Sequence, residues 1–568
     1  MPDGSQSLVQ TLLNAGVDTC FSSVHTADKH LDAAFSESSE FRTVATLFEG
    51  VATGAADGYA RMAEKPAVML SHYGFGLGNG QANLHNARKA KTPMINIVGS
   101  QARGDIAPGE IAAADVMRES DIEAVARNIS QWVRTSESAE KLPSEVLNAV
   151  SVAMGRPTQI STLIVPEDVL RVENVEPVQA MPVINATRSA EAVIDKTALD
   201  EIALDEILAA LKQGKDCAIM VGGRALQEPH LSLVAKIAKK SGARLISEVF
   251  PARMERGSGR PTVERLAYLA EMAEVQLRGL KHLIIVDTKP PVSFFAYPGK
   301  ASYLVPDGCS VHSLVAPEDD IASTLTSVSE QLGATNVEPA LQGPVKTKLP
   351  KGRLTGDKAC DVIAAFLPEN AIVSDEAQTS GAKLMAKTAG CPKHDLLTLT
   401  GGAIGQGLPV AVGAAVACPN RPVIAMTGDG SAMYTIQSLF TMVQEQLDVT
   451  TIIFNNFSYA ILNVELERVG VEGDAGPKAK SQLDLSGPNL DFVEIGNGMG
   501  MSSVRVDTCE NFASELQQAL AEPGPHLIEV VIPPTITGLK LKILPALLNG
   551  LKYLPTPMAR ALKNAIAP

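Results

Sequence analysis

A Gly-Asp-Gly turn between two apolar runs constrains the fold of this chain more than any other feature. The first run, Val423–Met426, reads as a buried strand, and an amphipathic segment follows the turn. A second apolar run, Val449–Phe454, ends on two asparagines, the second of which is Asn456. Because parallel strands in an open α/β sheet end at one edge, the pattern places the Asp429 carboxylate beside the Asn456 amide.

The residues at this sheet edge suit a diphosphate that is bridged by a metal ion. Hard oxygen ligands such as those of Asp429 and Asn456 suit Mg²⁺, which keeps open positions for phosphate oxygens. The free N–H groups at the start of the following helix suit the diphosphate itself. The alternative is an ordinary α/β turn followed by an incidental pair of asparagines.

A second motif, LFEGVATGAADGYAR, lies far upstream and begins at Leu47. Phe41–Leu47 reads as a strand, and Gly50–Met62 reads as a helix of small residues that can pack closely. Glu49 lies at their junction among apolar neighbours, which disfavour the charged form of a carboxyl group and let it share a proton. The alternative is a glutamate that only interacts with the dipole of a helix N-terminus.

Together these motifs resemble those of the thiamine-diphosphate-dependent enzymes, in which GDG precedes NN by about 25 residues and a glutamate opens the pattern E-x-x-x-x-x-A-A-D-G-Y-A-R. The resemblance implies that Asp429, Asn456 and the main-chain carbonyl of Ser458 hold Mg²⁺. It implies that Glu49 bonds the aminopyrimidine ring of thiamine diphosphate, whose imino form removes the proton from the thiazolium C2. It places four further residues at the cofactor: Gly428, Gly430, Ser431 and Asn455.

The segment TGGAIGQGLP precedes an expected helix at Val410–Ala417 and is the third motif of the resemblance. The resemblance implies that Ile404 is an aliphatic wedge beneath the thiazolium, which bends the cofactor so that its amino group meets C2. It also implies that the carbonyl of Gly402 accepts a hydrogen bond from the aminopyrimidine. The alternative for Ile404 is a core residue without a cofactor role.

A glycine loop after the expected strand Ala67–Ser71 begins with His72. Its spacing, G-x-G-x-G-x-G, does not give the G-x-G-x-x-G of a dinucleotide site, which disfavours a nicotinamide dehydrogenase. The resemblance to benzoylformate decarboxylase-like enzymes, where a histidine precedes an asparagine by seven residues, implies a proton-transfer role for His72. The alternative is a structural donor at a strand end.

Near the N-terminus, FSSVHTADKH departs from the family pattern F-x-N-P-G-T-x-E. Thr26 remains where a small hydroxyl residue usually faces the substrate carboxylate. His25 is either a second acid–base group or a surface side chain of a rebuilt loop. This departure bears on the substrate class more than on the cofactor.

Substrate shape is expected to depend on side chains after the metal ligands and on a loop of the middle domain. We interpret Phe294, in the segment SFFAYPGK, as core packing. The expected substrate-pocket residues are Ile461, Leu462, Phe295, Tyr297 and Gln378.

The composition excludes several classes of protein. The formal net charge of −14 over 568 residues argues against binding to nucleic acid or to an anionic membrane. Seven cysteines without a CxxC pair read as thiols in a reducing compartment, so we expect a cytoplasmic protein. The segment Ser7–Leu13 reads as an amphipathic helix rather than a signal peptide, and we expect no membrane association.

The order of helices and strands predicts an α/β fold of three doubly wound parallel-sheet domains. We expect a pyrimidine-binding domain at 1–175, a middle domain at 195–340 and a pyrophosphate-binding domain at 354–535, followed by a basic helical tail at 536–568. In the middle domain, Tyr303–Val305 is an expected strand. Family resemblance implies a homodimer, or a tetramer of dimers, with each active site between two subunits.

The preferred function is a decarboxylase or carboligase that uses thiamine diphosphate and Mg²⁺ on 2-oxo acids, as in the acetolactate synthase-like group. A non-oxidative decarboxylase of the benzoylformate type is one alternative. A non-catalytic, cofactor-binding regulatory paralogue is another, and the presence of Glu49, Asp429 and Asn456 argues against it. True acetolactate synthases also carry FAD, but the middle domain lacks a flavin-specific pattern, so we predict no FAD.

Overall fold

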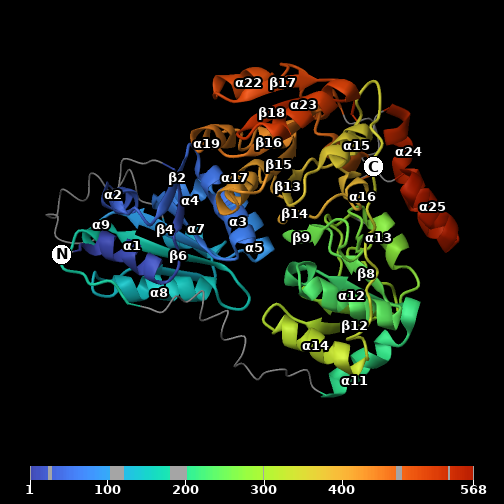
Figure 1. Cartoon of the computed structure of the whole chain (residues 1–568), viewed down its shortest axis with the longest axis horizontal. Coiled ribbons are helices and arrows are strands. Elements are labelled where there is room, and N and C mark those ends of the chain that lie inside the picture. Colours follow the sequence, from blue (N-terminus) through green and yellow to red (C-terminus); the bar gives the residue numbers. More distant parts are fainter. Residues whose placement is uncertain are drawn as a thin grey trace.

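The computed structural model describes residues 2–23, 29–102, 121–179, 201–297, 300–468, 476–534 and 538–566. Three α/β units follow one another along the chain. In Figure 1 the N-terminal unit lies on the left, the C-terminal unit at the top and the middle unit at the lower right. The predicted α/β fold of three sheet domains with a helical tail is confirmed.

The first sheet is parallel throughout the described residues and has the strand order β2-β1-β3-β4-β6-β5. Its central strands are buried along almost their whole length because helices cover both faces of a parallel sheet. The strands are β1 (Thr19–Ser23), β2 (Arg42–Thr46), β3 (Ala67–His72), β4 (Met94–Ser100), β5 (Trp132–Thr135) and β6 (Ile160–Pro166). The helices are α1 (Gly4–Asn14), α2 (Lys29–Glu37), α3 (Glu49–Ala63), α4 (Tyr73–Asn79), α5 (Gln81–Ala90), α7 (Ile122–Arg127), α8 (Leu142–Ala153) and α9 (Glu167–Leu170).

The second sheet has the order β10-β8-β7-β11-β12. The expected strand at Tyr303–Val305 is wrong: Tyr303 makes only an isolated bridge to Val292. The strand beside β11 is instead Ser310–Val315, whose exposed, polar edge hid it from an apolar pattern. The strands are β7 (Cys217–Val221), β8 (Arg244–Ser247), β10 (Glu264–Arg265), β11 (His282–Val286) and β12 (Ser310–Val315). The helices are α11 (Glu201–Leu211), α12 (His230–Ser241), α13 (Ala270–Leu277) and α14 (Ile321–Gln331).

The third sheet has the order β17-β18-β16-β15-β13-β14-β9, and its edge strand β9 (Arg253–Arg256) comes from the middle stretch of the chain. β9 pairs antiparallel with β14, which links the middle unit to this sheet. The other strands are β13 (Ala371–Glu376), β14 (His394–Thr398), β15 (Val423–Gly428), β16 (Val449–Asn455), β17 (Ser502–Val506) and β18 (His526–Val531). The helices are α15 (Gly356–Phe366), α16 (Leu384–Lys387), α17 (Gly407–Ala417), α18 (Asp429–Ala432), α19 (Ser438–Gln444), α20 (Ala460–Arg468), α21 (Pro477–Ser481), α22 (Phe492–Gly498) and α23 (Cys509–Ala521).

The tail forms α24 (Gly538–Gly550) and α25 (Thr556–Ile566), drawn in red at the right of Figure 1. Its apolar side chains, including Leu548 and Leu551, form one buried cluster with residues of α13 and with Val464 of α20. The tail is therefore fixed over the junction between the middle and C-terminal units. Among the described residues, every helix is too short or too polar to span a lipid bilayer.

Helices α3 and α17 join the N-terminal and C-terminal units through small residues. A Cβ atom on Gly413 would lie 1.8 Å from the backbone oxygen of Ala55, and one on Gly58 would lie 2.1 Å from that of Val410. Both contacts involve backbone atoms, which cannot move aside as a flexible side chain can. The small-residue helix expected from the sequence thus allows the close approach that positions Glu49 at the end of α3.

Replacement of Gly413 by alanine should destabilise the protein, because overpacking of a tight core contact typically costs about 1–3 kcal/mol. The thermal unfolding midpoint measures the effect. Gly498→Ala is the matched control, since a Cβ at this position of α22 would meet no atom within 4 Å. Equal midpoints for the two variants would contradict the close packing of α3 on α17.

Candidate active site

The Gly-Asp-Gly turn and the paired asparagines meet at the carboxyl edge of the third sheet. β15 ends at Gly428, which pairs with Phe454 of β16, and Asp429 opens α18. The Asp429 Oδ2 atom accepts hydrogen bonds from the N–H of Asn456 (3.1 Å) and of Ser458 (3.3 Å). The structure thus brings together the three residues that the sequence analysis predicted as metal ligands.

The Asn456 side chain is oriented by its own neighbours. Its amide nitrogen donates to Ser380 Oγ at 3.3 Å, and its amide oxygen accepts from the N–H of Ser458 at 3.0 Å. Between them, Phe457 has a left-handed backbone (φ 59°), an unfavourable conformation for a bulky residue. This bend turns the chain back so that Ser458 lies beside Asp429.

The oxygen donors at this edge are compatible with a bound cation. Burial raises the pKa of the Asp429 carboxyl, and backbone N–H groups, Gly430 first, oppose that rise. Among the described residues there is no cluster of three or more His, Cys, Asp or Glu side chains that could hold a metal ion. A donor set of one carboxylate, one amide and one carbonyl oxygen fits Mg²⁺ rather than zinc.

The space in front of the turn fits a diphosphate. A Cβ on Gly428 would meet no atom within 4 Å, so this side of the turn is open. A Cβ on Gly430 would lie 2.3 Å from the ring of Tyr459, so only glycine fits there. Ser431, in the same short helix, is buried beside them. The residues present therefore fit both groups that the sequence implied.

Asn455 has a different environment from Asn456. Its amide nitrogen donates to Glu529 Oε1 at 2.7 Å, and its amide oxygen accepts from the N–H of Phe457 at 3.2 Å. Both polar ends of the side chain are engaged within the protein. These contacts fix the loop that carries Asn456 and Ser458.

Glu49 is the first residue of α3 and is only 5% exposed. Asn79, at the end of α4, donates from Nδ2 to Glu49 Oε2 at 3.1 Å. A Cβ on Gly76 would lie 3.4 Å from Glu49 Oε1, so the glycine-rich segment packs against the carboxylate. That segment forms the helix α4 rather than the expected loop. In the sequence, Asn79 served only to define the seven-residue spacing from His72, whereas in the structure it orients Glu49.

His72 ends β3 and is 1% exposed. Its Nε2 atom lies 3.9 Å from the carboxylate of Asp32 on α2. The next residue, Tyr73, has a left-handed backbone (φ 55°). The other two predicted catalytic residues, His25 and Thr26, lie outside the described residues.

Glu376, at the end of β13, orders the loop that carries Gly402 and Ile404. Its carboxylate accepts from the N–H groups of Gly405 (2.7 Å), Gln406 (3.2 Å) and Gly407 (2.8 Å). Burial raises the pKa of Glu376 to about 7, and those three N–H groups oppose the rise. This role is not visible in the sequence because Glu376 lies about 30 positions before the loop that it holds.

Two glycines give this loop its shape. Gly402 (φ 81°) and Gly405 (φ 93°) both adopt the left-handed conformation that favours glycine. The loop is also tied to the N-terminal unit, because Asn83 donates to the Gly405 carbonyl (3.2 Å) and Asn86 donates to the Ala403 carbonyl (2.8 Å). Ile404, half-buried, lies between these anchored positions.

Glu376→Gln should flatten part of the pH dependence of stability. Because folding raises the pKa of this acid from 4.5 to about 7, its stabilising contribution is complete below pH 4.5 and is lost as pH rises through 7. Thermal unfolding midpoints of wild type and variant, measured across about pH 5 to 8, test this. Glu248, whose pKa burial also raises to about 7, is unchanged in both proteins, so their difference reports on Glu376. If the unfolding midpoints of the two proteins changed with pH in parallel, the raised pKa of Glu376 would be contradicted.

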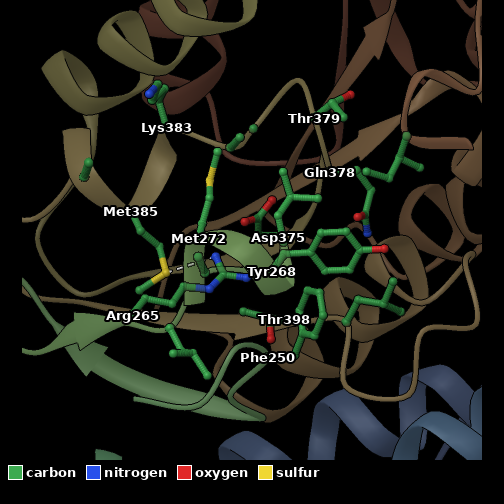
Figure 2. A pocket seen from close by; sticks show the side chains of 18 of the residues that line it. Phe250, Arg265, Tyr268, Met272, Asp375, Gln378, Thr379, Lys383, Met385 and Thr398 are labelled. Carbon is green, nitrogen blue, oxygen red and sulfur yellow. Dashed lines mark hydrogen bonds between the residues drawn. The ribbon is translucent and has the colours of Figure 1, made fainter. Parts of the chain in front are cut away.

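The predicted substrate residues divide between two places. Gln378 and Ile461 line a cavity together with Tyr268, as Figure 2 shows for Gln378 and Tyr268. Phe295 and Tyr297 line a smaller pocket that also includes Tyr268. Gln378 has a left-handed backbone (φ 49°).

Leu462 and Phe294 are both partly exposed, although Phe294 also lines the smaller pocket. Leu462 is 42% exposed and lies outside the residues that line the cavity. The interpretation of Phe294 as core packing is wrong, because it is 45% exposed. Its ring would clash at 2.3 Å with a Cβ on Gly402, so it covers the loop expected at the cofactor.

Comparison with known proteins identifies the class. Residues 2–123 match the family described as thiamine pyrophosphate enzyme, N-terminal TPP binding domain, and residues 379–530 match the C-terminal TPP binding domain. The chain is 47% identical over 534 residues to a Mycobacterium tuberculosis protein provisionally named acetolactate synthase large subunit IlvX. The aligned region covers 94% of this chain and 100% of that relative. The chain belongs to the thiamine diphosphate (thiamine pyrophosphate) enzyme family.

More distant relatives agree with this class. Benzoylformate decarboxylase of Pseudomonas aeruginosa is 27% identical over 511 residues, 86% of this chain and 92% of the relative. The structure of a thiamine diphosphate-dependent 4-hydroxybenzoylformate decarboxylase from Rhodococcus jostii has the same fold, with a TM-score of 0.79 at 22% identity over 94% of this chain and 99% of that one. The predicted family resemblance, the thiamine-diphosphate-binding domains and the prediction of an enzyme are confirmed.

Proposed function

We propose that this protein is a thiamine-diphosphate- and Mg²⁺-dependent enzyme that decarboxylates 2-oxo acids and either protonates the remaining fragment or joins it to a second carbonyl compound. The observation that carries the proposal is the meeting of Asp429, Asn456 and Ser458 at the open side of the Gly-Asp-Gly turn. The buried Glu49, oriented by Asn79, supports it from the N-terminal unit. The names of the two relatives at 47% and 27% identity agree with it.

The two ends of the cofactor are held by different parts of the chain. Asp429, Asn456 and the carbonyl of Ser458 would hold Mg²⁺, and the N–H groups at Gly430 and Ser431 would receive phosphate oxygens. Asn455 supports this loop through Glu529 and Phe457 rather than by direct contact. Thiamine diphosphate, when bound there, would supply a nucleophilic carbon and an electron sink for the decarboxylation of a 2-oxo acid.

Protons are handled by groups of the N-terminal unit. Glu49 holds a proton at the aminopyrimidine, where its buried position beside Asn79 keeps it in place. His72, buried at the end of β3, moves a proton to or from the substrate fragment. The loop ordered by Glu376 presents Ile404 and the Gly402 carbonyl to the cofactor.

Each active site combines two subunits in this proposal. Glu49 contacts residues of its own N-terminal unit, and Asp429 contacts residues of the C-terminal unit. We expect a homodimer, or a tetramer of dimers, without FAD and located in the cytoplasm. A monomeric mass by light scattering, or flavin absorbance in the purified protein, would contradict this part of the proposal.

A panel of 2-oxo acids with thiamine diphosphate and Mg²⁺ tests the function. CO₂ release and the carbonyl products are followed together. An aldehyde product indicates a simple decarboxylase, and a 2-hydroxy ketone indicates a carboligase. Cofactor binding without turnover of any member of a broad panel would overturn the proposal in favour of a non-catalytic paralogue.

A further inference from the structure

A cavity of about 560 Å³ lies where the middle unit, the C-terminal unit and the tail meet (Figure 2). Its wall comes from the chain around Arg265, from the segment after β13, from α20 and from Lys563 of α25. Gln378 and Ile461, two expected substrate residues, belong to this wall. Cavities of this size hold ligands larger than the smallest 2-oxo acids, since small-molecule sites commonly span about 300–1,000 Å³.

Charge in this cavity is strongly one-sided. Among the described residues of its wall, the cations are Arg256, Arg265, Lys383 and Lys563, and the one acid is Asp375. The chain as a whole carries a formal net charge of −14, so this local excess of positive charge runs against its composition. A cavity with such a lining favours an anion.

Arg256 provides the strongest evidence that this cavity binds an anion. It is only 8% exposed, and its Nη2 atom donates to the carbonyl of Met385. Its Nε and Nη1 atoms are buried and have no hydrogen-bond partner among the described residues. Burial and the neighbouring Arg265 lower the pKa of Arg256 to about 10. A buried guanidinium with two unpaired donors is costly unless a ligand completes its hydrogen bonds.

Arg265 donates one of its hydrogen bonds to a weak acceptor. Its Nε atom donates to the Val249 carbonyl at 2.6 Å, and its Nη1 atom donates to the sulfur of Met385 at 3.2 Å. Figure 2 shows this contact, with Asp375 close to the guanidinium. Sulfur is a weak acceptor, so an anionic oxygen would replace it favourably. The Asp375 carboxylate accepts from the N–H of Ala377 at 3.1 Å, and among the described residues it forms no ion pair with either arginine.

The rest of the wall suits a carbon chain. Phe250, Leu266, Tyr268 and Met272 present apolar surface on the same cavity. We propose that this cavity is a substrate subsite in which Arg256 and Arg265 bind the distal carboxylate of a dicarboxylic 2-oxo acid, while these apolar side chains contact its methylene groups. The assignment of the ligand as a substrate rests on the proposed function. The anion-binding site itself rests on the two arginines and the cavity.

Direct binding tests the subsite without cofactor or turnover. Glutarate and adipate, compared by calorimetry with butyrate and hexanoate, should bind to the wild-type protein, and their binding should weaken by about 10- to 100-fold in Arg256→Met and in Arg265→Met. Arg256→Lys guards against misfolding, because it keeps a charge and should retain part of the affinity. Arg171→Met is the control, since Arg171 is exposed just after α9.

Kinetics then separates the two proposals. Wild type should have a lower KM for 2-oxoadipate than for 2-oxohexanoate, and Arg256→Met should raise only the former by about 10- to 100-fold. Equal KM values for the two acids in both proteins, with normal turnover, would overturn the subsite and leave the proposed function standing. Dicarboxylate binding without turnover of any 2-oxo acid would overturn the proposed function instead. Binding of ADP or inorganic phosphate, with none of glutarate or adipate, would overturn the assignment to a dicarboxylic acid.

Discussion

Glu49→Gln is expected to lower turnover of 2-oxo acids by about 10²- to 10⁴-fold, the range that a positioned proton-transfer group contributes. Glutamine has nearly the same shape, so its side chain should still fit between Gly76 and Asn79. What it loses is the proton that the carboxyl group exchanges with the aminopyrimidine. Thiamine diphosphate binding should therefore persist, because the diphosphate is held at the far end by residues of the third sheet.

Cofactor affinity and turnover must be measured on the same preparations of this variant. Glu64→Gln is the matched control: it changes a glutamate at the opposite end of α3, where the side chain is 56% exposed. This control should keep full activity. Wild-type turnover by Glu49→Gln would refute the proton-transfer role, and loss of cofactor binding in that variant alone would show that Glu49 acts as an anchor instead.

The parts of the site that the sequence predicted are those set by local order along the chain. Asp429 and Asn456 follow two consecutive parallel strands, and such strands end at the same edge of a sheet. Their meeting could therefore be inferred without any knowledge of distant contacts. Glu49 was found in the same way, since a strand followed by a small-residue helix places its first residue at a sheet edge.

The roles that the sequence did not reveal depend on contacts over long separations. Glu376 holds a loop about 30 residues away, and its pattern is that of any strand end. Arg256 lies on a strand that leaves the middle unit to join β14, so nothing in its neighbours indicates burial in a cavity. The interpretation of Phe294 as a core residue was wrong for a different reason. An aromatic pair is typical of a protein core, but the ring of Phe294 lies over Gly402.

Asp429→Ala is expected to weaken Mg²⁺-dependent thiamine diphosphate affinity by at least about 100-fold, since even partners one contact removed from a metal commonly cost 10- to 100-fold. The same change removes the acceptor for the N–H groups of Gly430, Asn456 and Ser458. Each buried N–H left without a partner costs about 1–3 kcal/mol, so a lower unfolding midpoint should accompany the loss of affinity.

Asp429→Asn separates these two effects. An amide oxygen can still accept from the N–H groups of Asn456 and Ser458, so the loop should stay ordered while the charge that attracts the cation is gone. Asp448→Ala is the control, because Asp448 precedes β16 at the opposite edge of the same sheet. Cofactor binding that still depends on Mg²⁺ with wild-type affinity in both Asp429 variants would mean that the metal lies elsewhere. Since Asn456 and Ser458 are positioned through this same carboxylate, that result would remove the whole set of proposed ligands together.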